Sequence, residues 1–184
     1  NHSMKAYFVL FVFVCISCSG SQKIVSPTPK SSALDALVEK GKFEVTSDQA
    51  SPLLTSSMAA ISNSGLLGNG NSAGNINLIG NPNYLKVEGD TISADLPYYG
   101  ERQMGGGYNS NAGIKFKGIP QNYSLTKNET NQQYQINFQI SGEGAENFTI
   151  SLVLFPNWKS SLQINSSQRT PIRYSGEVQA LKEN

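Results

Sequence analysis

The chain is nearly devoid of cysteine and histidine. Its two cysteines, Cys15 and Cys18, and its single histidine, His2, all precede residue 19 of the 184. The rest of the sequence therefore offers neither a disulfide nor the thiolate and imidazole ligands of common zinc and copper sites. It also lacks the histidine that a Ser-His or Cys-His relay requires. We accordingly expect no metal, no cofactor and no enzyme of these classes.

The chain also lacks a clear excess of positive or negative charge. The chain has 14 Lys and Arg against 13 Asp and Glu, which gives a formal net charge of +1. Nucleic-acid-binding domains usually carry a clear basic excess. The balance therefore predicts that nucleic acid is not a partner.

The longest apolar run is too short to span a membrane. Residues Ala6–Ile16 follow Lys5, whereas a spanning helix needs about 20 apolar residues. A charged residue, a short apolar stretch and a small residue before a cut are typical of a signal peptide, here residues 4–17 with Met4 as the expected start. The stretch from Cys15 to Cys18 resembles a bacterial lipobox. We therefore predict that Cys18 is lipidated and that the bilayer is a partner.

The next segment combines a polar tether with a short helix. Residues 18–31 are predicted to be the lipidated cysteine and its flexible tether. Ala33–Lys40 has apolar residues at helical spacing, with Ser32 as the expected N-cap and Gly41 as the expected end. Residues 32–184 are predicted to form a single domain.

From Phe43 onward the apolar residues recur with a period of two, which is typical of strands with one buried side. Gly89-Asp90 and the Gly142–Gly144 turn separate strands in the manner of hairpins. The polar residues between the apolar ones are expected to face the other way, as in the set Gln135, Asn137, Gln139, Thr149 and Ser151. The pattern predicts an all-β fold, an antiparallel β-sandwich or strongly curled sheet with one short N-terminal helix.

Two glycine-rich segments interrupt this pattern. Between Ser62 and Asn83, 12 of 22 residues are Asn or Gly, so most of the segment is expected to be a mobile loop, with one short strand around Ile76–Ile79. The second segment, Gly105–Gly107, lacks the Lys-Ser/Thr and the helix of a phosphate-binding loop. It is interpreted as a flexible connection.

The sequence offers two kinds of candidate chemistry. Asp95, Glu101 and Glu177 are the carboxylates nearest to aromatic or glycine-rich segments. A pair for glycoside hydrolysis would be Asp95 with Glu177, although solvated surface charges are the favoured interpretation. Arg169 and Arg173 flank Pro171, where a structural salt bridge is favoured over an anion site.

Four aromatic residues fall at strand ends or in loops, namely Tyr98, Tyr99, Tyr108 and Trp158. Flat aromatic faces next to amide side chains suit a glycan or peptide ligand. The alternative, which we favour, is that these side chains seal the edge of the sheet.

Three separated blocks carry a resemblance to a known family. They are Asp95–Gly100, Gly113–Phe116, and Ser167–Arg169 followed by Ile172–Gly176. In these blocks the chain resembles the Bacteroidota lipoprotein family DUF4251, a domain of unknown function, over roughly Leu34 to Leu181. The resemblance implies an all-β secreted domain and transfers no catalytic residues. In that phylum surface lipoproteins tend to have acidic residues just after the lipidated cysteine, and Ser19–Lys23 has none. The resemblance therefore implies a lipid-anchored position at the outer membrane, facing the periplasm.

Together these observations predict a membrane-anchored bacterial lipoprotein of the cell envelope that acts as a non-enzymatic binding or envelope-support module. The alternative is a carboxylate-only hydrolase or an inhibitor that acts on envelope polymers.

Overall fold

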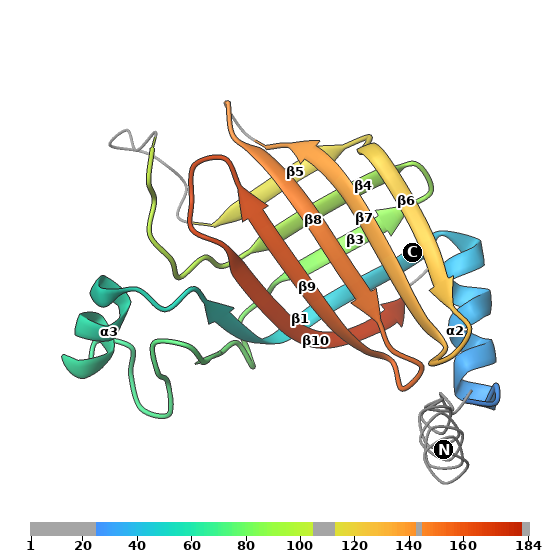
Figure 1. The fold of residues 1–184 in the computed structure, drawn as a ribbon, viewed down its shortest axis with the longest axis horizontal. Coiled ribbons are helices and arrows are strands. Elements are labelled where there is room, and N and C mark those ends of the chain that lie inside the picture. Colours follow the sequence, from blue (N-terminus) through green and yellow to red (C-terminus); the bar gives the residue numbers. More distant parts are fainter. Residues whose placement is uncertain (1–24, 105–112, 143–144, 182–184) are drawn as a thin grey trace, which may run out of the picture.

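Figure 1 shows the fold in a computed structural model that describes residues 25–104, 113–142 and 145–181. The elements are the helices α2 (Pro29–Lys40) and α3 (Ser56–Asn63) and the strands β1 (Lys42–Pro52), β2 (Ile76–Asn77), β3 (Tyr84–Glu88), β4 (Thr91–Leu96), β5 (Ile114–Gly118), β6 (Gln121–Asn128), β7 (Gln133–Ser141), β8 (Asn147–Leu154), β9 (Lys159–Ser166) and β10 (Ile172–Ala180).

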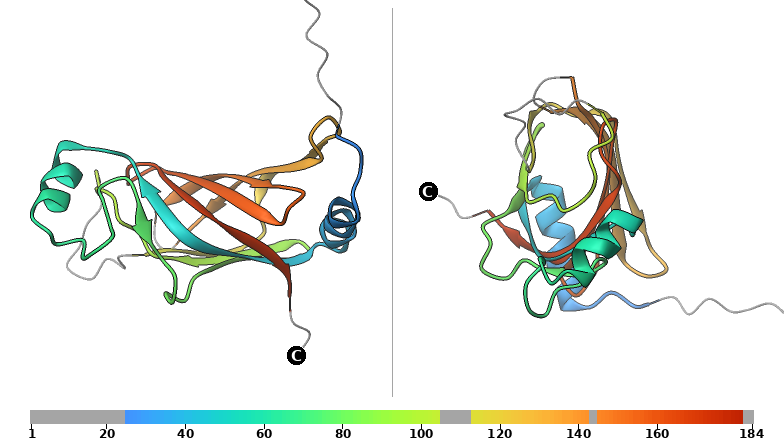
Figure 2. Two further views of the ribbon diagram at one scale, coloured as in Figure 1. Left: turned by 90° about the horizontal axis from the view of Figure 1, so that it is seen from below. Right: turned by 90° about the vertical axis from the view of Figure 1, so that its left-hand side faces the viewer.

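The strands form one antiparallel sheet in the order β5-β4-β3-β1-β10-β9-β8-β7-β6, with β2 pairing to β1 off this path. Figure 2 shows how strongly the sheet curls, so that β3–β5 form one arm and β6–β9 the other. The prediction of an all-β antiparallel fold with a strongly curled sheet is confirmed. The expected hairpins are also present, and Gly89 has a φ of 68° at the β3–β4 turn, where glycine carries no steric cost.

The core lies between the two arms, because each strand turns its apolar residues to the inside of the curl. Phe116 on β5 contacts Phe138 on β7 and Phe148 on β8, with ring centroids 6.5 and 5.7 Å apart. The apolar face of a sheet must be covered by another apolar surface. The curl meets this requirement within a single sheet.

Helix α2 lies at one end of the curled sheet (Figure 1) and buries Leu34, Leu37 and Val38. The expected N-cap, Ser32, is wrong: Thr28 caps the helix by accepting a hydrogen bond from the Ser31 backbone N–H. Proline suits the first helical position because its missing N–H needs no partner there, so the helix begins at Pro29 and includes the last residues of the expected tether. Gly41 ends the helix as predicted, with a φ of 60°.

Helix α3, at the opposite end of the sheet (Figure 1), was not expected from the sequence. Thr55 caps it by accepting a hydrogen bond from the Met58 N–H, and Met58 is its buried residue. The Asn/Gly-rich segment that follows consists of turns and includes β2, which confirms part of the expected short strand around Ile76. Neither helix in the described part of the chain has the length and apolar character to cross a bilayer.

Candidate functional site

The outer side of the arm β6–β9 carries rows of amide and hydroxyl side chains. Side chains alternate between the two faces along a strand, and residues paired across neighbouring strands lie on the same face. The polar residues of these strands pair with one another and therefore share the outer face. We call this surface the amide face. Its three rows are Gln121, Gln139, Thr149 and Asn165; Ser124, Asn137, Ser151 and Gln163; and Thr126, Gln135, Val153 and Ser161.

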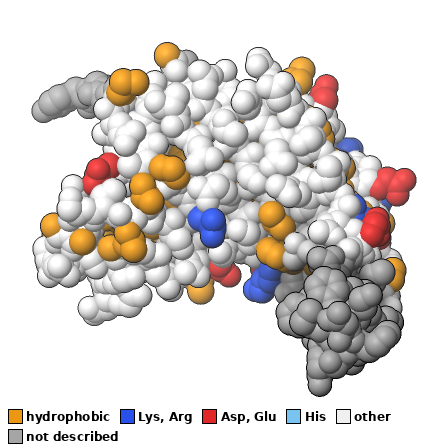
Figure 3. All heavy atoms as spheres, viewed as in Figure 1, with side chains coloured by type: hydrophobic (Ala, Val, Ile, Leu, Met, Phe, Trp, Pro, Cys, Tyr) orange, Lys and Arg blue, Asp and Glu red, His pale blue; other side chains and the backbone are white. Residues whose placement is uncertain are grey.

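None of these rows contains a charged residue. Figure 3 views the molecule from this side and shows a broad area without charged side chains, with the charges gathered toward its margins. Arg173 on the neighbouring strand β10 contacts the second row, since its Nε donates to Gln163 Oε1 at 3.2 Å. The amide face is therefore a surface that offers hydrogen-bond donors and acceptors without charge.

A groove of about 540 Å³ opens at the end of the amide face away from α2. This volume falls in the range of small-ligand sites, about 300–1,000 Å³. The first row of the amide face lines the groove, and the end of β7, the start of β8 and the end of β9 with Ser167 form its wall. The lining residues are Gln121, Gln139, Ile140, Ser141, Asn147, Phe148, Thr149, Asn165, Ser166 and Ser167.

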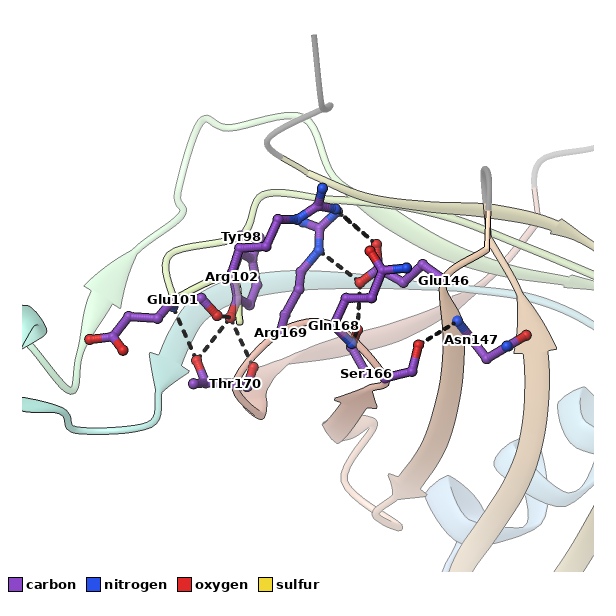
Figure 4. Close-up of polar contacts among 10 residues, drawn as sticks. Tyr98, Glu101, Arg102, Glu146, Asn147, Ser166, Gln168, Arg169 and Thr170 are labelled. Atoms are coloured by element: carbon purple, nitrogen blue, oxygen red, sulfur yellow. Dashed lines mark hydrogen bonds and ion pairs between the residues drawn. The ribbon is translucent and has the colours of Figure 1, made fainter. Parts of the chain in front are cut away.

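A buried ion pair lies directly behind the groove wall (Figure 4). Glu146, just before β8, accepts hydrogen bonds from Arg169 Nε at 2.8 Å and Arg169 Nη2 at 3.1 Å. Arg102 Nη2 lies 3.1 Å from the same carboxylate. The Glu146 and Arg169 side chains are each only 5% exposed. Such a two-point contact between guanidinium and carboxylate fixes distance and orientation together.

The Glu146 carboxylate also positions the groove wall. Ser166 Oγ donates to Glu146 Oε1 at 2.5 Å and accepts from the Gln168 backbone N–H at 2.9 Å. Next to them, the Asn147 backbone N–H donates to Ser167 Oγ at 3.1 Å. These contacts join the start of β8 to the end of β9 (Figure 4). The ion pair therefore holds the groove wall in one arrangement.

Tyr98 belongs to the same network. Its hydroxyl lies 2.9 Å from the Thr170 carbonyl oxygen and 3.0 Å from the Glu101 carbonyl oxygen, and the Arg169 guanidinium lies 5.1 Å from the ring centroid. Burial raises the pKa of Tyr98 above its ordinary value. The side chain is thus engaged by contacts within its own domain.

The other candidate aromatics do not join Tyr98 in one site. Tyr99 is half-buried against the core, and Tyr108 lies outside the described residues. Trp158 precedes β9, whereas Tyr98 contacts Thr170 beyond its other end, so roughly 25 Å of strand separates them. The Trp158 Nε1 donates to the Lys30 carbonyl oxygen of α2 at 3.1 Å.

The expected carboxylate pair is also kept apart. Asp95 lies on β4 and Glu177 on β10, with β3 and β1 between them. Three strand spacings amount to about 14 Å. Asp95 forms an ion pair with Lys115 at 3.0 Å. Glu177 binds Lys159 at 2.6 Å, and this contact lowers the pKa of Glu177 and raises that of Lys159.

Glu101 has a structural partner at the start of α3. Its Oε1 accepts a hydrogen bond from Thr55 Oγ1 at 2.5 Å, and this bond is the main cause that lowers the pKa of Glu101. The described residues contain no group of three or more His, Cys, Asp or Glu side chains placed to hold a metal ion. Cys18 and Gly105–Gly107 lie outside the described part of the chain.

The salt bridge of Arg169 was predicted from the sequence, whereas the role of Glu146 was not. The structural salt bridge expected at Arg169 is confirmed, while Arg173 binds an amide rather than a carboxylate. Glu146 was missed because its partners are 23 and 44 residues away in sequence. The amide face did leave a signal: the outward residues of β7 and β8 are uncharged and, apart from Val153, polar.

Comparisons with known proteins place the chain next to one family. Residues 28–178 match the family described as "Domain of unknown function (DUF4251)". A crystal structure of a DUF4251 family protein from Bacteroides eggerthii DSM 20697 has a similar fold, with a TM-score of 0.55 and 13% sequence identity. The likeness covers 82% of this chain and 87% of that one. The chain has no match among the curated proteins.

Proposed function

Since the chain belongs to the DUF4251 family, whose description leaves its role open, we propose from the residues themselves that it is a lipid-anchored, non-enzymatic module of the bacterial cell envelope that binds a neutral glycan. The groove at the end of the amide face is the observation that carries this proposal.

The chemistry of the groove favours a neutral glycan. Amide side chains both donate and accept, and hydroxyl groups do the same. A sugar offers the same combination in its hydroxyl groups. An acidic or basic ligand would lose its hydration without meeting an opposite charge, and this is costly. Among the lining residues none carries a charge.

The position of the groove suits a tethered protein. Lipidation at Cys18 would leave seven residues to Val25, a reach of at most about 25 Å. The Val25 N–H donates to the Thr130 carbonyl oxygen at 2.8 Å, beside α2. The end of the sheet at α2 would therefore face the membrane, and the groove would open away from it. Multiple acyl chains would give stable anchoring, and the lack of acidic residues in Ser19–Lys23 favours the periplasmic side of the outer membrane.

The carboxylates support a non-enzymatic role, because those singled out from the sequence have structural partners. Asp95 and Glu177 each bind a lysine, and Glu101 binds the cap of α3. Glu146, the buried carboxylate, binds two arginines. A catalytic pair needs two carboxyl groups on either side of one bond.

The glycan proposal is tested by presenting the purified full-length chain to an array of neutral and acidic glycans. We expect binding to neutral glycans, and a loss of about 0.5–1.5 kcal/mol on Asn165→Ala, which removes one hydrogen-bonding side chain. Gln179→Ala is the matched control, because it removes an exposed amide from β10 outside the groove. Binding to none of the neutral glycans, or hydrolysis of any of them, would overturn the proposal.

The anchoring proposal is tested separately by mass spectrometry of the native protein. We expect acyl chains on Cys18 and recovery with the outer membrane, and release into the soluble fraction on Cys18→Ala. Protection from added protease in intact cells, but not in permeabilised ones, is expected for the periplasmic side. An unmodified thiol on Cys18 would refute the anchor.

A further inference from the structure

The first row of the amide face is a ladder with one side chain per strand. Its members, Gln121, Gln139, Thr149 and Asn165, pair with one another from β6 to β9. Neighbouring strands lie about 4.8 Å apart. This spacing is close to the length of one pyranose residue in an extended, β-linked glycan chain.

The side chains of this ladder are available to a ligand. Gln121, Thr149 and Asn165 line the groove without a side-chain hydrogen bond to another described residue. Gln139 uses its Oε1 to accept from Asn122 Nδ2 at 2.9 Å, which leaves its own amide N–H groups for a further partner. The row can therefore offer one hydrogen-bonding contact on each of the four strands.

We propose that an extended, β-linked neutral polysaccharide lies across the strands in this groove, with successive sugars placed over successive strands from β6 to β9. This inference rests on the proposed function, since it specifies the ligand of the same site. It specifies the direction of the polysaccharide relative to the strands, the number of sugars in contact with the protein and the type of glycosidic linkage.

The direction follows from the distances on the two axes of the sheet. Along a strand, side chains on one face recur only every second residue, or about 6.7 Å. A polysaccharide with a repeat near 5 Å does not match that 6.7 Å spacing. It does match the spacing of about 4.8 Å between neighbouring strands. The second row is less suitable, because its member on β9, Gln163, already accepts a hydrogen bond from Arg173.

The buried ion pair explains how the ladder stays in register. Ser166 follows Asn165, the last member of the row, and its hydroxyl group is held by Glu146. Asn147 precedes the strand segment that carries Thr149, and its N–H is held by Ser167. Both contacts fix the ends of β8 and β9 against one another. A weak, multi-point ligand gains from such preorganisation.

The test is a length series of neutral oligosaccharides, measured by NMR titration of the full-length protein with glucose, cellobiose, cellotetraose and cellohexaose. We expect affinity to rise about tenfold from cellobiose to cellotetraose, as two more side chains engage, and then to level off at cellohexaose. Maltohexaose, which is α-linked and curved, is expected to bind at least several-fold more weakly than cellohexaose.

Variants of the protein test whether the oligosaccharide lies along the first row of the amide face. Asn165→Ala is expected to weaken cellotetraose about two- to tenfold and cellobiose less, because the shorter ligand can shift to the remaining side chains. Gln179→Ala, the matched control on β10, should change neither. Equal affinity for cellobiose and cellotetraose would overturn this inference and leave the proposed function standing. So would a lack of binding across the cello series when other neutral glycans bind. Failure of all neutral glycans to bind would refute both.

Discussion

The buried ion pair behind the groove gives a prediction about stability. Glu146→Gln keeps the shape of the side chain but removes the negative charge that faces Arg169 and Arg102. The Glu146 and Arg169 side chains are almost fully excluded from water, so the buried Arg169 guanidinium would face a neutral amide in place of a carboxylate. We expect this variant to be strongly destabilised.

The magnitude follows from the burial of the pair. Removing one partner of a buried ion pair typically costs about 3–5 kcal/mol, mostly because the other charge stays buried. For a chain of this size each kcal/mol shifts the melting temperature by about 2–4 °C. The expected decrease in Tm for Glu146→Gln is therefore roughly 6–20 °C.

Thermal and urea unfolding followed by circular dichroism measure the effect. The matched control is Glu177→Gln, which removes the same charge from a pair whose side chains are 66% and 51% exposed. Surface pairs contribute little, so this variant should unfold almost as the natural sequence does. If Glu146→Gln melted within about 2 °C of that control, the pair would contribute no more than a surface pair, and our account of the groove wall would be wrong.

Three further predictions concern the sheet and its pH dependence. Gly176→Ala should destabilise the protein by about 1–3 kcal/mol in urea unfolding, because its Cβ would clash with the β1 backbone, whereas Gly118→Ala, where the space is open, should be neutral or slightly stabilising. Asn83→Ala should cost about 1–3 kcal/mol in the same assay, since the buried Asn83 amide brackets the backbone N–H and C=O of Ser47 at 2.8 and 2.9 Å; wild-type stability would contradict that role. The lowered pKa of Glu101 means that its stabilising contribution is present at neutral pH and is lost as the pH falls through the folded-state pKa. Glu101→Gln should therefore flatten the curve of unfolding free energy against pH between about pH 5 and 3. An unchanged slope would refute this.

The strands and hairpins could be predicted from the sequence, because they depend on the local periodicity of apolar residues. The alternation from Phe43 onward predicted strands with one buried side, and Gly89 and Gly142 marked two of the hairpin turns. These features need only neighbours in sequence. Helix α3 was missed because its residues are mostly small and polar, and its cap, Thr55, is bound to Glu101, 46 residues further along the chain.

What depends on distant contacts could not be predicted. Nothing local indicates that Asp95 and Glu177 lie on strands with two others between them, or that Tyr98 and Trp158 lie at opposite ends of β9. Glu146 looks like an ordinary loop residue until its arginines come from two other connections. The amide face was visible as polar residues, but its lack of charge across four strands emerges only once the register is known.

The pairing of β1 with β10 at the centre of the sheet also has a consequence for folding. The first strand of the sheet and the last are direct neighbours, with Phe43 opposite Ala180. The two arms can each form hairpins early, but they cannot join until the final strand has become available. Such long-range closure slows folding. In a chain that is emerging from a ribosome or a translocation pore, the sheet would thus remain incomplete until β10 is released.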